Sequence, residues 1–358
     1  MAAEKNDATG APVNSILVVA GGTGGHIFPA LVFGRWLERH RGASVTWLSG
    51  SRPIEATIYA SAGVTPRRLS LEGSPLGVRS PGRVLKRSLS LFSAFGETSR
   101  CLAESRPRAA FLFGSYVSLA PLLLCRLRKI PVVVHEQNAV AGRVTRLAAR
   151  LGARIAAGWP ECLGVKNFTT VGIPTREPTR LPRAEALSRL CPGLSGDRLG
   201  GSTKIVGVAM GSLGSRPLAE KIIEAAGELA GRKVALVLLG DAPDGMEAPE
   251  NVLFVGRRWD MDPFYSLCDV LVCRAGGATL AEALRWGLPT VTVPWAGAAE
   301  GHQERNARCF AAMGDGVVWH EGITVSLAAA IEDQLNRERA AVFSNDDPCE
   351  ALAKIAGL

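Results

Sequence analysis

The chain has 358 residues, of which 47% are hydrophobic and 21% charged, so it accommodates two globular domains, each with its own core, and is not a disordered or fibrous protein. The formal net charge is +8, but no aromatic and basic interleaving of a nucleic-acid-binding module accompanies it, and we expect no nucleic-acid partner. The eight cysteines are scattered singly without metal-ligand spacing, which indicates reduced core residues in a cytoplasmic protein.

Residues 1–14 are small and polar and lack the basic start and apolar stretch of a signal peptide, so we expect a disordered tail. Apolar, β-branched runs then alternate with helical patterns. The expected strands are 16–20, 45–48, 110–113, 132–134 and 155–157 in the first half and 205–209, 234–239, 252–255, 270–273 and 290–293 in the second. This alternation predicts an α/β protein with two doubly wound parallel sheets covered by helices on both faces.

The segment Gly172-Ile173-Pro174 marks the expected boundary between two domains. We predict an N-terminal domain over residues 15–172 and a C-terminal domain over residues 173–339. A final helix at about 340–358 is expected to pack back on the first domain. Two doubly wound domains place a cleft between the carboxyl ends of their strands, where ligands bind.

The stretch 21–29, Gly-Gly-Thr-Gly-Gly-His-Ile-Phe-Pro, follows the first expected strand and predicts a glycine turn and a helix start. Glycines permit positive φ and close approach of a ligand, and a helix start favours negative charge. His26 at this position indicates catalysis, or alternatively a glycine-rich connection with a capping histidine. Ile27 stands where the dinucleotide fingerprint needs glycine, and Gly25-His26 replaces the Gly-Lys of the mononucleotide loop. A hydride-transfer enzyme or a kinase is therefore not expected.

Residues 67–108 concentrate positive charge, with nine basic residues against three acidic ones and hence a net +6. Within them one helical repeat comprises Leu85, Leu89, Phe92 and Phe95, beside Arg83, Lys86 and Arg87. One helix would thus carry an apolar and a cationic face. Such a helix suits an anionic membrane surface, where each basic residue contributes about 1 kcal/mol, or it packs in the ordinary way with a solvated basic face.

Glycine-rich segments also follow strands of the second half. Residues 211–215 offer backbone N–H groups and the Ser212 hydroxyl to a phosphate. Residues 274–282 follow another strand and begin a helix, where 276–279 would hold a diphosphate and Glu282 would accept hydrogen bonds from both hydroxyls of a ribose. Equally, Thr279 and Glu282 have the spacing of a capping box that satisfies the helix itself.

Polar side chains follow two further expected strands. His302, Gln303 and Asn306 come after the strand at 290–293, and a helix would direct them broadly toward one side. His135-Glu136-Gln137-Asn138 follows the strand at 132–134 in the same way. Imidazole and amide groups pair donors with acceptors, so these clusters suit the hydroxyls of a sugar.

Together these motifs resemble those of the inverting β-N-acetylglucosaminyltransferases of peptidoglycan synthesis, the MurG family. The resemblance spans about residues 15–335 and rests on segments 21–29, 116–118, 135–142, 172–176, 274–282 and 302–307. It implies two Rossmann-like domains facing each other across a cleft in the GT-B arrangement, with UDP-N-acetylglucosamine held mainly by the second. It also implies lipid I, an undecaprenyl-diphosphate-linked acceptor, and peripheral docking of the basic helix on the anionic cytoplasmic face of the cell membrane.

The expected reaction is direct displacement at the anomeric carbon of UDP-N-acetylglucosamine by the C4 hydroxyl of the muramoyl sugar, which gives a β-linkage and lipid II. His26 is the expected general base, because an ordinary histidine pKa of about 6.5 suits proton transfer near neutral pH. The expected substrate-binding residues are Thr23, Gly24, Gly25, Asn138, Arg176, Ser212, Gly276, Thr279, Glu282, His302, Gln303 and Asn306. We expect neither a metal nor another cofactor.

Two departures from the family pattern concern the nucleotide. The segment 210–215 has lost a glycine and a glutamine beside the phosphates, and Arg257 and Arg258 stand where an apolar segment near the uracil is usual. Three alternatives therefore stay open, namely a related GT-B transferase with another acceptor, a nucleotide-sugar epimerase and a non-catalytic cell-wall scaffold.

Overall fold

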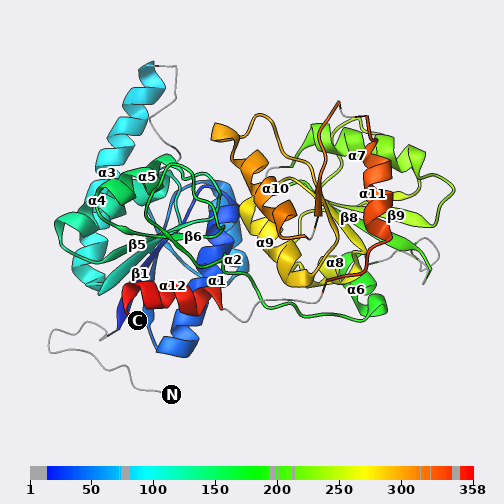
Figure 1. Cartoon of the computed structure of the whole chain (residues 1–358). Helices are drawn as coiled ribbons and strands as arrows, with labels where there is room; N and C mark the ends of the chain where they lie inside the picture. The colour runs from blue at the N-terminus through cyan, green and yellow to red at the C-terminus, as the bar shows by residue number, and fades with distance from the viewer. Residues whose placement is uncertain are drawn as a thin grey trace. The chain divides into compact units, whose positions relative to one another are not determined.

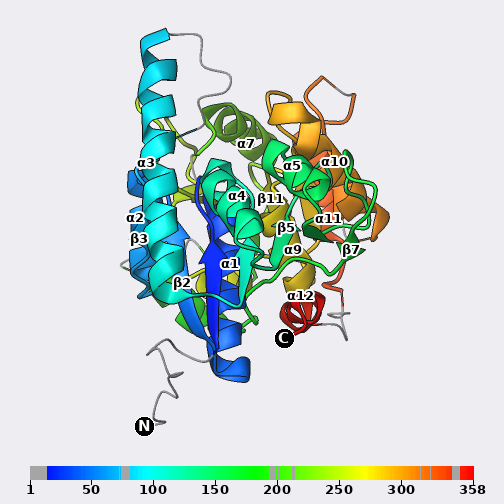
Figure 2. The same cartoon turned by 90° about the vertical axis from the view of Figure 1, so that its left-hand side faces the viewer.

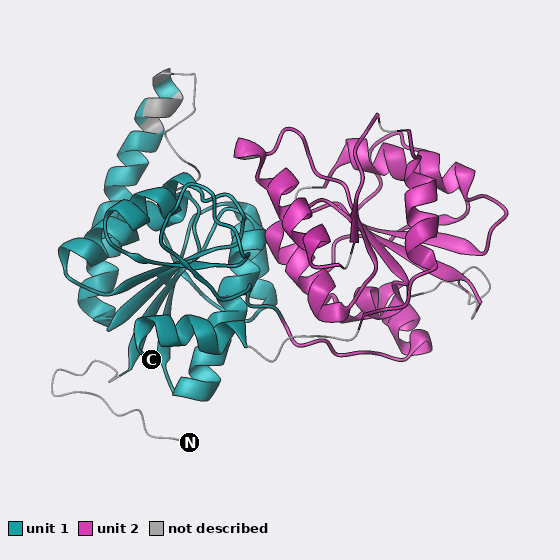
Figure 3. Cartoon of the chain, in the orientation of Figure 1, with its two compact units in different colours: residues 1–175, 345–358 teal, residues 176–344 magenta. Residues whose placement is uncertain are grey.

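The computed structural model describes residues 14–71, 73, 81–192, 199, 202–211, 214–314, 316–322, 324–340 and 347–358. The chain divides into two compact units, unit 1 with Met1–Thr175 and Asn345–Leu358 and unit 2 with Arg176–Ser344 (Figure 3). Each unit contains a parallel sheet with helices on both faces (Figure 1), which confirms the predicted α/β class with two doubly wound sheets. The disordered tail predicted at 1–14 lies outside the described residues except for Asn14.

Among its described residues, unit 1 has a seven-stranded sheet in the order β3-β2-β1-β4-β5-β6-β7. Its strands are β1 (Ser15–Val19), β2 (Ser44–Ser49), β3 (Arg67–Arg68), β4 (Ala109–Leu112), β5 (Val132–Glu136), β6 (Arg154–Ala157) and β7 (Thr169–Thr170). The direction of winding reverses between β1 and β4. Ligands of doubly wound sheets bind at the carboxyl ends of the strands beside such a reversal.

The helices of unit 1 cover this sheet because each presents one apolar face to it. They are α1 (Gly24–Arg41), α2 (Pro53–Ser61), α3 (Pro81–Ser105), the short η1 (Tyr116–Ser118), α4 (Leu119–Leu127), α5 (Arg143–Arg150) and α12 (Pro348–Ala356). On one face, Leu17, Val19 and Leu112 of the strands pack with Leu102 of α3 and Leu122 of α4. Successive strand residues point to opposite faces, so the strand residues between these pack toward the other layer.

Helix α12 closes unit 1 by packing against α1 and β5, although more than 200 residues separate it from them in sequence (Figure 1). The Arg41 guanidinium forms an ion pair with Glu350 at 2.6 Å. Helix α1 in turn approaches β2 closely at Gly34, where a Cβ would lie 2.1 Å from Trp47 Cη2. Helix α1 is therefore held by contacts with both α12 and β2.

Unit 2 repeats this architecture, with six parallel strands among its described residues in the order β10-β9-β8-β11-β12-β13. The strands are β8 (Lys204–Ala209), β9 (Val234–Leu239), β10 (Val252–Phe254), β11 (Val270–Cys273), β12 (Thr290–Thr292) and β13 (Gly316–Val318). The helices are α6 (Arg183–Leu190), α7 (Arg216–Glu228), α8 (Asp262–Leu267), α9 (Gly277–Trp286), the short η2 (Ala299–Gly301), α10 (His302–Ala312) and α11 (Leu327–Leu335). Here the winding reverses between β8 and β11.

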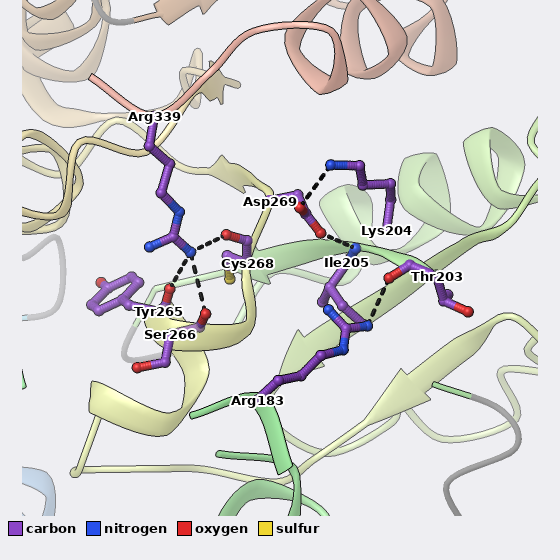
Figure 4. A network of polar contacts seen from close by, with 9 residues as sticks. All are labelled: Arg183, Thr203, Lys204, Ile205, Tyr265, Ser266, Cys268, Asp269 and Arg339. Carbon is purple, nitrogen blue, oxygen red and sulfur yellow. Dashed lines mark hydrogen bonds and ion pairs between the residues drawn. The ribbon is translucent and has the colours of Figure 1, made fainter. Parts of the chain in front are cut away.

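A polar network ties the amino ends of β8 and β11 to the segments around them (Figure 4). Arg339, which follows α11, donates to the backbone carbonyls of Tyr265 at 2.9 Å and Ser266 at 3.3 Å, and also to that of Cys268. Asp269 bonds Lys204 Nζ at 3.1 Å and the backbone N–H of Ile205 at 2.7 Å. Structural contacts thus occupy this edge of the sheet, and the glycine-rich segments lie at the opposite, carboxyl edge.

Helix α3 has an exposed apolar stripe on its outer face. Its first turns stand away from the rest of unit 1 in Figures 1 and 2. The side chains of Leu85, Leu89 and Phe92 are 63%, 62% and 75% exposed, whereas Ala94 and Leu102 are buried. No helix in the described part of the chain combines the length and apolarity needed to cross a bilayer.

Candidate active site

The glycine turn after β1 runs into the first turn of α1, as the sequence predicts. Thr23 is the N-cap residue with an extended backbone, and its carbonyl accepts a hydrogen bond from His26 N at 3.1 Å. Gly22 has a φ of 88°, and a Cβ there would lie 2.7 Å from Ser115 Oγ. A Cβ on Gly21 would lie 2.6 Å from Val117 Cγ2. Packing against the turn after β4 therefore accounts for Gly21 and Gly22. The close approach of a ligand to this turn stays a prediction.

A buried carboxylate from α2 fixes this turn. Glu55 Oε1 accepts from the backbone N–H of Gly22 at 2.7 Å and from the hydroxyl of Tyr116 at 2.7 Å. Glu55 is fully buried. The sequence did not single out Glu55, because no local pattern connects it with a turn 33 residues away.

His26 lies in the first turn of α1, half-buried, and its Nδ1 is 2.8 Å from Gln137 Oε1. Gln137 Nε2 is 3.0 Å from His135 Nδ1, and His135 Nε2 is 2.9 Å from the carbonyl oxygen of Gly172. Burial lowers the pKa of His135 to about 4, so this ring is neutral near neutral pH. The sequence placed His135 and Gln137 at a strand end but gave neither a role of its own.

Glu136 organises the segment that follows β5. Its Oε1 accepts from both the backbone N–H and the side-chain amide of Asn138 at 3.1 Å. Its Oε2 accepts from Gly142 N at 2.9 Å and from the Thr145 hydroxyl at 2.5 Å. A carboxylate that accepts several hydrogen bonds is stabilised despite its burial. Asn138, half-buried, is thereby held at the carboxyl edge of the sheet.

In unit 2, helix α9 begins directly after β11 with its N-terminus at the carboxyl edge. Gly276 is the N-cap residue, in extended conformation, and Thr279 is the third helical residue. The capping box that Thr279 and Glu282 could form is therefore not present, because Thr279 does not occupy the N-cap. The first N–H groups of α9 have no side-chain cap from Gly276 and suit a phosphate.

Glu282 lies one turn into α9 and is bound from two sides. The Tyr265 hydroxyl donates to its Oε2 at 2.9 Å, and Arg176 approaches its Oε1 at 3.5 Å. Arg176 also donates to the carbonyl of Trp259 at 2.7 Å. Burial, together with the charge of Glu282, raises the pKa of Tyr265, which therefore stays a donor. Each carboxylate oxygen keeps a further acceptor site.

Gln303 and Asn306, two residues of the polar cluster that begins α10, hold neighbouring segments of unit 2. Gln303 Oε1 accepts from the backbone N–H of Trp295 at 2.9 Å. Asn306 is buried and donates to the carbonyl of Ala275 at 3.0 Å, which positions the segment before α9. His302 is half-buried as the first residue of α10.

Two arginines belong to or contact the segments in which this chain departs from the family pattern. Arg274 is buried and donates to Ser215 Oγ at 3.0 Å and to the carbonyl of Val293 at 3.1 Å, so it joins the segments after β8 and β12. Arg258 donates to the carbonyl of Leu190 at the end of α6 at 3.0 Å. Ser212 lies outside the described residues.

The predicted site residues thus divide between the two units, each set at the carboxyl edge of its own sheet. Unit 1 brings Thr23, Gly24 and Gly25 together with His26 in one turn, and Asn138 follows β5. Unit 2 places Arg176 against Glu282 and brings Gly276 and Thr279 to the start of α9, beside the segment that Asn306 holds. Both sets flank the strands between which the winding reverses.

Comparison with known proteins identifies the family. The glycosyltransferase family 28 N-terminal domain matches residues 16–157, and the glycosyltransferase family 28 C-terminal domain matches residues 205–348. A UDP-N-acetylglucosamine--N-acetylmuramyl-(pentapeptide) pyrophosphoryl-undecaprenol N-acetylglucosamine transferase of Ectopseudomonas mendocina is 33% identical, over 90% of this chain and 89% of its own. The chain belongs to the MurG family of glycosyltransferase family 28. The enzyme of the same name from Pseudomonas fluorescens strain Pf-5 is also 33% identical, with the same coverage of both chains.

Solved structures share the fold of this MurG-family chain. MurG of Acinetobacter baumannii matches with a TM-score of 0.64 and 23% identity, over 97% of this chain and 99% of its own. CalG4, the calicheamicin glycosyltransferase, matches with a TM-score of 0.61 and 17% identity, over 96% and 98%. These likenesses concern the fold alone, and with the two parallel sheets they confirm the predicted GT-B class.

Proposed function

We propose that this protein transfers N-acetylglucosamine from UDP-N-acetylglucosamine to the C4 hydroxyl of the muramoyl sugar of lipid I, with inversion, and so forms lipid II. The observation that carries the proposal is the relationship over 90% of the chain to transferases whose names state this donor sugar and this undecaprenol-linked acceptor. The chain is a UDP-N-acetylglucosamine-dependent glycosyltransferase by the same relationship.

Unit 1 supplies the base. As the C4 oxygen bonds to the anomeric carbon, His26 takes the hydroxyl proton, and the bond from that carbon to the UDP oxygen breaks. Attack from the face opposite UDP converts the α-linked donor into a β-linked product. A well-placed base contributes about 10²- to 10⁴-fold to the rate. Thr23, Gly24, Gly25 and Asn138 lie in the same unit and are proposed to contact the acceptor and the reacting sugar.

Unit 2 holds the nucleotide sugar. The N-terminus of α9 at Gly276 and Thr279, with Arg176 and Ser212, is proposed to stabilise the departing diphosphate. Glu282, oriented by Tyr265 and Arg176, accepts hydrogen bonds from the ribose hydroxyls. We propose that the polar residues at the start of α10 bind the hydroxyls of the sugar or position the groups that bind them. These residues are His302, Gln303 and Asn306.

The acceptor is anchored in a membrane, and we propose that the enzyme acts as a peripheral protein on its cytoplasmic face. The exposed Leu85, Leu89 and Phe92 of α3 would enter the lipid headgroup region. The excess of basic residues between 67 and 108 would favour anionic lipids. An exposed apolar stripe is costly in water, and insertion would relieve that cost.

A donor assay with radiolabelled UDP-N-acetylglucosamine tests the proposal against its alternatives. We expect label to enter the lipid fraction only when lipid I is present. Transfer only to a different acceptor would identify a related GT-B transferase, and consumption of donor without acceptor would identify an epimerase. A protein without turnover under all these conditions would be a scaffold, which would overturn the proposal.

A further inference from the structure

Gln137 joins two histidines at the carboxyl edge of the unit 1 sheet. Its side-chain oxygen lies 2.8 Å from His26 Nδ1, and its side-chain nitrogen lies 3.0 Å from His135 Nδ1. That nitrogen also lies 3.1 Å from the backbone carbonyl oxygen of His135. Gln137 and His135 are only 2% and 1% exposed, so water does not substitute for these contacts.

A backbone carbonyl decides which way the Gln137 amide points. A carbonyl oxygen accepts hydrogen bonds and cannot donate, so the amide atom beside the carbonyl of His135 must be the –NH₂ group. The amide atom beside His26 is then the oxygen, which only accepts. His26 Nδ1 must therefore carry a hydrogen.

A second carbonyl leads to the same assignment from the other end. The Gly172 carbonyl accepts from His135 Nε2 at 2.9 Å, so this nitrogen carries the hydrogen. Because burial keeps the His135 ring neutral, with a pKa of about 4, its Nδ1 is an acceptor. That acceptor faces the –NH₂ of Gln137 at 3.0 Å, which agrees with the first assignment.

Gln137 is held independently of His26. The indole N–H of Trp159 donates to the backbone carbonyl of Gln137 at 3.0 Å. Gly114 lies beside the ring of His26, where a Cβ would be in ordinary van der Waals contact at 3.5 Å from Nδ1 and Cε1. The amide is thus a fixed acceptor against which the His26 ring is oriented.

We propose that Gln137, fixed by His135 and the Gly172 carbonyl, is a positioning residue that keeps neutral His26 in its Nδ1–H tautomer and so leaves Nε2 free to take the acceptor's proton. The inference rests on the proposed role of His26 as general base. A histidine side chain free in water favours the opposite tautomer, in which Nε2 carries the hydrogen and cannot act as the base. An aspartate sets the histidine tautomer in serine proteases; here an uncharged amide does so.

Nitrogen NMR of the full chain labelled with ¹⁵N in the histidine rings tests the tautomer directly. The chain has five histidines, and loss of signals in His26→Ala assigns the ring of interest. At a pH at which the His26 ring is neutral, we expect the Nδ1–H tautomer in the wild type and mainly the Nε2–H tautomer in Gln137→Met. A wild-type ring already in the Nε2–H form, or a His26 ring that stays in the Nδ1–H form in Gln137→Met, overturns the proposal.

Kinetics tests the consequence. Gln137→Met should lower kcat about 10- to 100-fold with little change in the KM for UDP-N-acetylglucosamine, and the double variant with His26→Ala should be no slower than His26→Ala alone. Additive losses would mean that Gln137 acts independently of His26. A changed tautomer with unchanged turnover would overturn this inference alone, whereas full turnover by His26→Ala would remove the base from the proposed function itself.

Discussion

At the scale of single residues, His26 is the group on which turnover should depend most. We expect His26→Ala to lower kcat about 10²- to 10⁴-fold and to leave the affinity for UDP-N-acetylglucosamine unchanged, because a general base acts in the transition state. Steady-state kinetics with calorimetric donor binding measures both. His40→Ala is the matched control, an exposed histidine at the other end of the same helix. If the His26→Ala variant kept full turnover, His26 would be excluded as the base.

Glu282 should determine donor affinity rather than the chemical step. Hydrogen bonds to a charged group contribute about 1.5–3 kcal/mol, so Glu282→Gln should raise the KM for UDP-N-acetylglucosamine about 10- to 100-fold. The KM for lipid I should stay the same. Tyr265→Phe serves as control, because it removes one contact of Glu282 and keeps the carboxylate. An unchanged donor KM in Glu282→Gln would show that the ribose lies elsewhere.

His135 should make the stability of unit 1 sensitive to acid. Its pKa is about 4 in the folded protein against 6.5 in the unfolded chain, so the unfolded state binds the proton first as pH falls. The contribution of neutral His135 to the free energy of unfolding is fully present above pH 6.5. This contribution declines by at most about 3 kcal/mol as the pH falls to 4. Urea unfolding would be measured at pH 7 and pH 4.5. Between these two pH values, the free energy of unfolding should decline less for His135→Gln than for the wild type or His40→Gln. Equal declines would contradict this assignment.

At the scale of elements, α3 should determine membrane binding. Replacing Leu85, Leu89 and Phe92 by serine removes three exposed side chains, each of which contributes about 1.5–3 kcal/mol when fully buried in an apolar phase. We expect at least a tenfold loss of sedimentation with anionic vesicles and little change in thermal stability. Met313→Ser, an exposed apolar position in unit 2, should bind like the wild type. Undiminished binding by the triple variant would assign docking to another surface.

Most strands could be predicted from the sequence because parallel strands buried on both faces are continuous apolar, β-branched runs. All ten expected strands are present, with ends shifted by up to two residues. The strands that were not predicted, β3, β7 and β13, lie at sheet edges and have two or three residues. The pair Arg67–Arg68 of β3 carries no apolar signal at all; backbone pairing with β2 alone makes it a strand.

The candidate site was predictable where its chemistry is local. A glycine turn, a helix start and a polar strand end are contiguous in sequence, so His26 and Glu282 could be selected as candidates. The contacts that fix them could not, because Glu55 reaches Gly22 over 33 positions and Gln137 reaches His26 over 111. The sequence also could not decide the capping-box alternative at Thr279. The observed start of α9 at Gly277 excludes it, because Thr279 is then not the N-cap residue.

At the scale of the whole molecule, one architecture occurs twice with different side chains at its helix start. Each unit has a parallel sheet, a reversal of winding and a glycine-containing helix start after a central strand. In unit 1 the helix start carries a histidine, which suits proton transfer. In unit 2 the helix start carries Gly276 and Thr279, with Glu282 one turn further, which suits a nucleotide. We therefore expect the same local structure to support different chemistry in the two units through these few side chains.

The linkage in the product of the full chain tests the central claim most directly. Purified enzyme, lipid I vesicles and radiolabelled UDP-N-acetylglucosamine would be incubated, and the lipid-linked disaccharide would be isolated and its linkage determined by NMR. We predict a β-linked N-acetylglucosamine on the C4 oxygen of the muramoyl sugar. An α-linkage, attachment at another hydroxyl or label recovered only as free sugar would contradict inverting transfer to lipid I.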